Sequence, residues 1–180
     1  MDRKLIIMFA PLDLVGVVNA LIGIAEVLLQ RGHRIVFAVS DKWRGKLGVY
    51  GFEEAIIGHQ ESQTIEDPAK YWAECWANSG LFGSKSPIEK LKSLNSAEGM
   101  GDIISKLQES EPFLEQIVDR IKPDVIIVDN FSYTPSLMNC GIPWVWCISC
   151  NPLYIDYAIE DERIPPMASG LCSNLGIWYF

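Results

Sequence analysis

The stretch KPDVIIVDNF at residues 122–131 decides the fold class of this chain. A Lys-Pro pair that stops a helix comes first, four apolar residues follow at 125–128, and Asp129 and Asn130 close the run. A continuous run rich in Ile and Val is typical of a strand that is buried on both faces of a parallel sheet. The stretch therefore predicts such a strand, with a carboxylate at its carboxyl end.

Working outward from this stretch, strand and helix signals alternate along the chain. Apolar runs predict strands, and apolar residues at helical spacing or between capping residues predict helices. Alternation of this kind indicates an α/β fold with a parallel sheet and right-handed crossovers. The expected strands are 5–9, 35–39, 52–57, 125–128 and 143–148, and the expected helices are 18–29 (ended by Gly32), 43–47, 87–94, 103–121 and 133–140.

Residues 58–99 interrupt this alternation and carry no strand signal. The segment 68–78 suits a helix with Trp72 and Trp76 on one face, four residues apart. Such an aromatic pair is by default core packing. Because long excursions from a compact domain often bind ligands, the pair could instead line an apolar ligand pocket.

Composition excludes several functional classes. The chain of 180 residues has 15 Lys plus Arg against 23 Asp plus Glu, a net charge of −8, which disfavours nucleic acid or an anionic membrane as the main partner. The first apolar run, 5–10, is too short to span a bilayer. Five cysteines, an odd number, do not resemble a secreted disulfide framework, so a reduced, cytoplasmic setting is expected.

The loop at residues 11–19, PLDLVGVVN, lacks the glycine patterns of dinucleotide-binding and P-loop proteins. Ligands of open parallel sheets bind beyond the carboxyl ends of the strands. This loop is one such place, and Gly16 is expected to let the backbone turn into the following helix. The others lie around Ser40, at 129–133 and at 149–151.

Asp129 is the most informative single residue of these ends. A carboxylate at a strand's carboxyl end could orient a base, bind a hydroxyl or hold a metal. It could equally be a helix N-cap or a turn former for the next element. Nearby, Cys147 and Cys150 form a C-x-x-C pattern without a second ligand pair, so no metal site is expected and both thiols are interpreted as buried and inert. Trp144 and Trp146 are interpreted as core residues.

Taken in order, these pieces resemble the N-terminal half of the UDP-glycosyltransferases. The resemblance rests on the opening strand, the Gly-x-Val-Asn-Ala loop from Gly16 to Ala20, the run GHRIVF at 32–37, the stretch 122–131 and the turn GIPW at 141–144. It implies the GT-B fold, in which two Rossmann-like domains with helices on both sheet faces meet across a cleft. Residues 1–180 would then be one incomplete domain that binds the acceptor, without the C-terminal domain for the UDP-sugar.

The resemblance also implies roles for individual residues. In this family a His takes the proton of the acceptor hydroxyl, which attacks the sugar with inversion, and an Asp orients that His. Asp129 matches the Asp, whereas Val17 stands where the His is expected and cannot accept a proton. The residues expected to bind the acceptor are Gly16, Val17, Asn19, Trp72, Trp76, Phe131 and Asn151. Asp13, in the same loop, is a conceivable substitute base.

Two functions remain open. The first is the acceptor-binding part of a UDP-glycosyltransferase for small lipophilic acceptors, with UDP-sugar as co-substrate of the full-length protein and no cofactor bound by this chain. It would be weakened by Val17 and inactive without a donor domain. The second is a non-catalytic small-molecule-binding pseudoenzyme, or the acceptor half of a split enzyme whose partner chain supplies the donor site.

Overall fold

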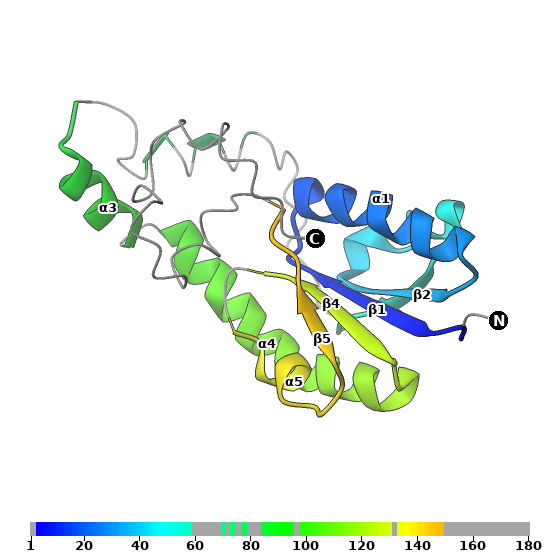
Figure 1. Ribbon diagram of the computed structural model, residues 1–180. Coiled ribbons are helices and arrows are strands. Elements are labelled where there is room, and N and C mark those ends of the chain that lie inside the picture. Colours follow the sequence, from blue (N-terminus) through cyan, green and yellow to red (C-terminus); the bar gives the residue numbers. More distant parts are fainter. Residues whose placement is uncertain are drawn as a thin grey trace, which may run out of the picture.

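The structure is a computed structural model that describes residues 3–58, 70, 73–74, 77–78, 84–95, 98–130 and 133–149. Its centre is a five-stranded parallel sheet in the order β3-β2-β1-β4-β5 (Figure 1). The strands are β1 (Ile6–Pro11), β2 (Arg34–Val39), β3 (Glu53–Ile56), β4 (Val125–Asp129) and β5 (Trp144–Trp146). The predicted α/β class and all five predicted strands are confirmed, with small shifts at their ends.

Helices cover both faces of this sheet, as a Rossmann-like fold requires. Helix α1 (Val15–Gln30) lies on one face, while α4 (Glu98–Ile121) and the short α5 (Pro135–Met138) lie on the other (Figure 1). α3 (Pro87–Asn95) lies apart from the sheet and agrees with the predicted helix 87–94. The predicted helix 133–140 is only one turn long, and α4 begins five residues earlier than the apolar spacing indicates.

Each face of the sheet has its own hydrophobic core. On the α1 face, Val18, Leu21 and Ile22 pack with Phe9 and Phe37, whose rings stack with centroids 4.9 Å apart. On the opposite face, α4 contributes Leu114, Ile117 and Val118, which pack against Met8, Val36, Ala38, Ile126 and Val128. These strands are hydrophobic on both sides because both of their faces are covered.

A local signal sets the carboxyl end of α1. The helix ends at Gln30, and Gly32 follows with φ +86°, a conformation that glycine adopts without steric cost. The amides of Gly32 and His33 then donate to the carbonyls of Leu29 and Leu28. Gly32 therefore ends the helix as predicted.

The segment after β2 differs from the expected helix over 43–47. Two 3-10 turns take its place, η1 (Asp41–Trp43) and η2 (Gly48–Tyr50). The Glu54 carboxylate accepts the backbone N–H groups of Gly45, Leu47 and Gly48 at 2.7–3.1 Å. This side chain from β3 satisfies backbone donors that a longer helix would have paired internally.

Candidate functional site

The strand order reverses between β1 and β4, the position where open α/β sheets bind ligands. β1 ends at Pro11, which lies in register with Asp129 at the end of β4. The backbone N–H of Leu12 donates to the Asp129 carbonyl at 2.7 Å, and α1 begins three residues later at Val15. The candidate site is therefore built from the loop after β1 and the carboxyl end of β4.

Asp129 is almost completely buried at this point, with 3% of its surface exposed. Its Oδ1 accepts a long hydrogen bond of 3.4 Å from the Ser149 backbone N–H, and its Oδ2 is buried without a partner among the described residues. Burial raises the pKa of this carboxyl, and interactions with the Ser149 side chain and backbone only partly oppose the rise. The side chain caps no helix, since Thr134 is the N-cap residue of α5, so the N-cap alternative is wrong.

The Cys147 thiol lies near this carboxylate, just after β5. Burial and the negative charge of Asp129 both raise the pKa of this thiol. A thiol with a raised pKa is a poor nucleophile, which agrees with the interpretation of Cys147 as inert, but its residue is half-buried rather than buried as predicted. Its partner in the C-x-x-C pattern, Cys150, lies outside the described residues.

The loop residues expected to bind the acceptor differ in their exposure to solvent. Val17 is buried in the first turn of α1, whereas Gly16 and Asn19 are exposed on that helix. Gly16 is not the turn that was predicted, because the helix already begins at Val15. An added Cβ at Gly16 would meet nothing within 4 Å, and its φ is not positive.

Asp13, the conceivable substitute base, is held by three side chains. Its Oδ2 accepts the Ser40 hydroxyl at 2.8 Å and lies 3.0 Å from Lys42 Nζ, while its Oδ1 accepts the Trp43 indole N–H at 2.7 Å. Both oxygens of this carboxylate are therefore already engaged by donors from the segment after β2. This network instead fastens the loop after β1 to the segment after β2.

Histidine does not serve the candidate site among the described residues. His33 Nδ1 accepts the backbone N–H of Leu5 at 3.2 Å, which places this ring at the amino-terminal end of β1, opposite Asp129. The remaining predicted site residues, Trp72, Trp76, Phe131 and Asn151, lie outside the described residues, as does His59.

The aromatic residues of β5 are not core residues. Trp144 and Trp146 are 39% and 40% exposed, because β5 is one of the two edge strands of the sheet. The Trp146 indole N–H donates to the Asn130 carbonyl at 2.9 Å, and the Asn130 amide donates to Thr134 Oγ at 3.3 Å. Trp146 thus supports the backbone just after Asp129 from the neighbouring strand.

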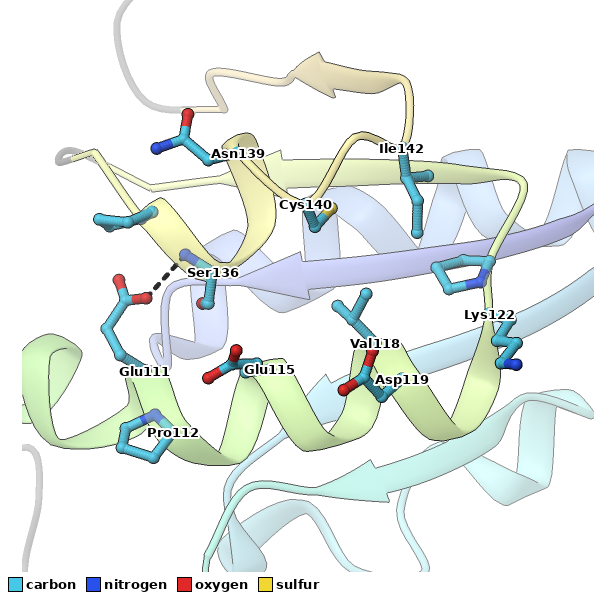
Figure 2. Close-up of a pocket in the computed structure, with 12 residues that line it drawn as sticks. Glu111, Pro112, Glu115, Val118, Asp119, Lys122, Ser136, Asn139, Cys140 and Ile142 are labelled. Carbon is cyan, nitrogen blue, oxygen red and sulfur yellow. Dashed lines mark hydrogen bonds between the residues drawn. The ribbon is translucent and has the colours of Figure 1, made fainter.

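A groove that the sequence did not predict lies between α4 and α5 (Figure 2). It encloses about 790 Å³, and Glu111 on its wall accepts the Ser136 backbone N–H at 2.8 Å. None of the predicted site residues lines it. The acidic residues Glu111, Glu115 and Asp119 recur every four positions of α4, so a helical projection of the sequence could have placed them on one face.

Within the described ranges, no cluster of His, Cys, Asp or Glu has the arrangement of a metal site. The same residues include no helix that is both long and apolar enough to cross a membrane.

Comparison with known proteins relates the fold to one class of enzyme. No family model and no curated protein matches the sequence. Among solved structures, the glycotransferase of kitacinnamycin superposes with a TM-score of 0.52 at 16% identity, over 87% of this chain and 34% of that one. The Streptomyces sp. SF2575 glycosyltransferase SsfS6 does so with a TM-score of 0.51 at 14% identity, over 78% of this chain and 38% of that one.

These superpositions establish the fold and its extent. The chain has the Rossmann-like α/β fold found in GT-B glycosyltransferases, and it spans little more than a third of the length of the solved structures that it matches.

Proposed function

We propose that this chain is the N-terminal, acceptor-binding domain of a UDP-glycosyltransferase that transfers a sugar with inversion to a small lipophilic acceptor. The observation that carries the proposal is the buried carboxylate of Asp129 at the strand-order reversal of a glycosyltransferase-like fold. Burying an incompletely paired carboxyl is costly, and such groups concentrate at functional sites. The sequence resemblance assigns the acceptor side of the GT-B cleft to this half of the fold.

The proposed transfer is slow because the site lacks a proton acceptor at the expected position. Val17 is an apolar residue buried in α1, the described His33 lies at the opposite edge of the sheet, and the Asp13 oxygens are already occupied. Loss of a general base costs on the order of 100- to 10,000-fold in rate. Acceptors with acidic hydroxyls, such as phenols, suffer least because their proton leaves easily.

The sugar donor binds outside this chain in the proposed arrangement. SsfS6 has been solved in complex with thymidine diphosphate, and this chain covers 38% of that protein. A nucleotide-sugar is therefore the proposed co-substrate, and the sequence resemblance favours UDP-sugar. The donor domain would come from a longer form of the protein or from a partner chain.

A second function is favoured by the apolar character of position 17. With Val17 in place of a base, the site could bind lipophilic molecules without converting them. Binding would then persist in the presence of UDP-sugars, and no glycosylated product would form.

The test begins with the intact mass of the native protein, because a two-domain enzyme requires about twice this length. That protein is incubated with UDP-glucose and a series of phenols and aliphatic alcohols, and products are measured by mass spectrometry. The enzyme function predicts phenol glycosides, formed faster by Val17→His. The matched control is the double variant Val17→His/Asp129→Asn, in which the gain disappears. If both the parent and Val17→His bind these acceptors but form no product, the second function, binding without catalysis, is favoured over the enzyme.

A further inference from the structure

Asp129 Oδ2 is one of two buried side-chain atoms without a hydrogen-bond partner in the described part of the chain, the other being Ser136 Oγ. It is buried, and no described group donates a hydrogen bond to it. A carboxylate oxygen that loses water without gaining a donor destabilises the folded state, so native proteins rarely retain one without a reason. The second oxygen, Oδ1, accepts the long 3.4 Å bond from the Ser149 backbone N–H, and the Ser149 side chain also interacts with this carboxyl.

The hydrogen bonds described around this carboxylate go to other acceptors or to Oδ1. The Asn130 amide donates to Thr134 Oγ, and the Trp146 indole donates to the Asn130 carbonyl. The Ser149 N–H donates to Oδ1, the Ser149 side chain also interacts with this carboxyl, and the Cys147 thiol is at best a weak donor. Among the described residues, no hydrogen bond reaches Oδ2.

We propose that Asp129 Oδ2 accepts a hydrogen bond directly from the hydroxyl of a small lipophilic ligand, without an intervening imidazole. The proposal deepens the acceptor-binding function and rests on it. Pro11 and Leu12, which the sheet register and backbone bonding bring beside Asp129, are apolar. One buried acceptor with apolar residues on one side suits a ligand that has a hydrophobic body and one hydroxyl.

Such a site distinguishes ligands by whether they leave the Asp129 carboxylate without a hydrogen bond. Without a ligand, Oδ2 is buried and lacks a hydrogen-bond donor, which the ligand hydroxyl would supply. A methyl ether with the same hydrophobic body cannot donate, so it would leave the carboxylate without a partner. Sites built around a buried polar group reject analogues that lack the matching hydroxyl far more strongly than sites that recognise only shape.

The experiment measures the binding of 2-naphthol and 2-methoxynaphthalene to the 180-residue chain by isothermal titration calorimetry. We expect 2-naphthol to bind at least about tenfold more tightly. Asp129→Leu removes the acceptor and should reduce this preference to less than about threefold. Asp119→Asn, at an exposed position of α4, also removes one negative charge and should retain the preference. Circular dichroism verifies that each variant is folded.

A second measurement needs no substitution. The ¹³Cγ resonance of Asp129 in the labelled chain should move when 2-naphthol is added and stay in place with 2-methoxynaphthalene. Equal affinity for the two ligands, or an unchanged preference in folded Asp129→Leu, would overturn the direct contact and leave the acceptor-binding function standing. Failure of both ligands to bind would contradict the acceptor-binding function and the contact together.

Discussion

The Asp13 carboxylate accepts the indole N–H of Trp43 at 2.7 Å, and this bond joins the loop after β1 to the first turn after β2. Trp43 is 8% exposed, so its indole N–H has little access to water as an alternative partner. Ser40 and Lys42 bind the same carboxylate through its other oxygen. Both segments lie at the carboxyl edge of the sheet, so this carboxylate helps to shape the candidate site without being its base.

Asp13→Ala should destabilise the protein by about 1–3 kcal/mol, because it leaves the buried Trp43 N–H unpaired. Asp13→Asn keeps an oxygen that can accept from Trp43, so its cost should be smaller. Urea unfolding monitored by tryptophan fluorescence measures both values.

The same variants test the role of Asp13 in catalysis. In a form of the protein that transfers sugar, folded Asp13→Asn should keep most of its turnover. A loss of turnover of about 100-fold or more, without a matching loss of stability, would show that Asp13 acts as the base after all.

Glu54→Gln should destabilise the protein by roughly 1–3 kcal/mol. The carboxylate accepts three backbone N–H groups from the segment after η1, and an amide has only one oxygen with which to accept. The measurement is the free energy of unfolding in urea.

Glu53→Gln is the matched control, since it is the same change one residue away. Glu53 forms a two-bond ion pair with Arg34, which lowers the pKa of the Glu53 carboxyl, but both side chains are about half exposed. Exposed pairs contribute about 1 kcal/mol or less. A larger loss for Glu53→Gln than for Glu54→Gln would contradict the role assigned to the three backbone bonds.

The central part of the fold was predictable because its signals are local. The apolar run at 125–128 and the glycine at position 32 identify a buried strand and a helix end from their immediate neighbours. The short edge strand is different. Trp144 and Trp146 look like core residues in the sequence, and only the strand order reveals that β5 lies at the edge of the sheet.

In the candidate site, too, some features could be predicted from local sequence and others could not. The position of Asp129 follows from a general rule about parallel sheets, and the structure confirms that it lies at the strand-order reversal. The hydrogen bonds of Asp13 could not be predicted from the sequence, because its partners Ser40, Lys42 and Trp43 come from a different loop 27–30 residues away. The missing partner of Asp129 Oδ2 was equally beyond a sequence argument, since it depends on every donor around it.

Trp146→Phe should cost about 0.5–1.5 kcal/mol, because it removes the indole bond to the Asn130 carbonyl. Trp144→Phe is the matched control on the same strand, with nearly the same exposure. Its cost should be smaller. Thermal unfolding of the two variants measures the difference, and equal costs would mean that the bond to Asn130 contributes nothing beyond the packing of the ring.

Asp129 should make the stability of the protein depend on pH in a direction opposite to that of most carboxylates. Its pKa is raised in the folded state, so the folded protein holds the proton more tightly than the unfolded chain. As pH rises from the ordinary carboxyl pKa through the raised one, the unfolded chain loses its proton first. Stability from this group therefore falls across that window and levels off above it.

Asp129→Asn isolates this contribution, because the amide does not titrate. The stability of the wild-type protein relative to Asp129→Asn should decrease as pH rises through the window, and stay constant at higher pH. The neighbouring Cys147 thiol does not interfere, since its own raised pKa keeps it neutral there. Unfolding free energies of both proteins at several pH values give the comparison. Parallel curves would mean that Asp129 has an ordinary pKa and that its buried carboxylate is already satisfied.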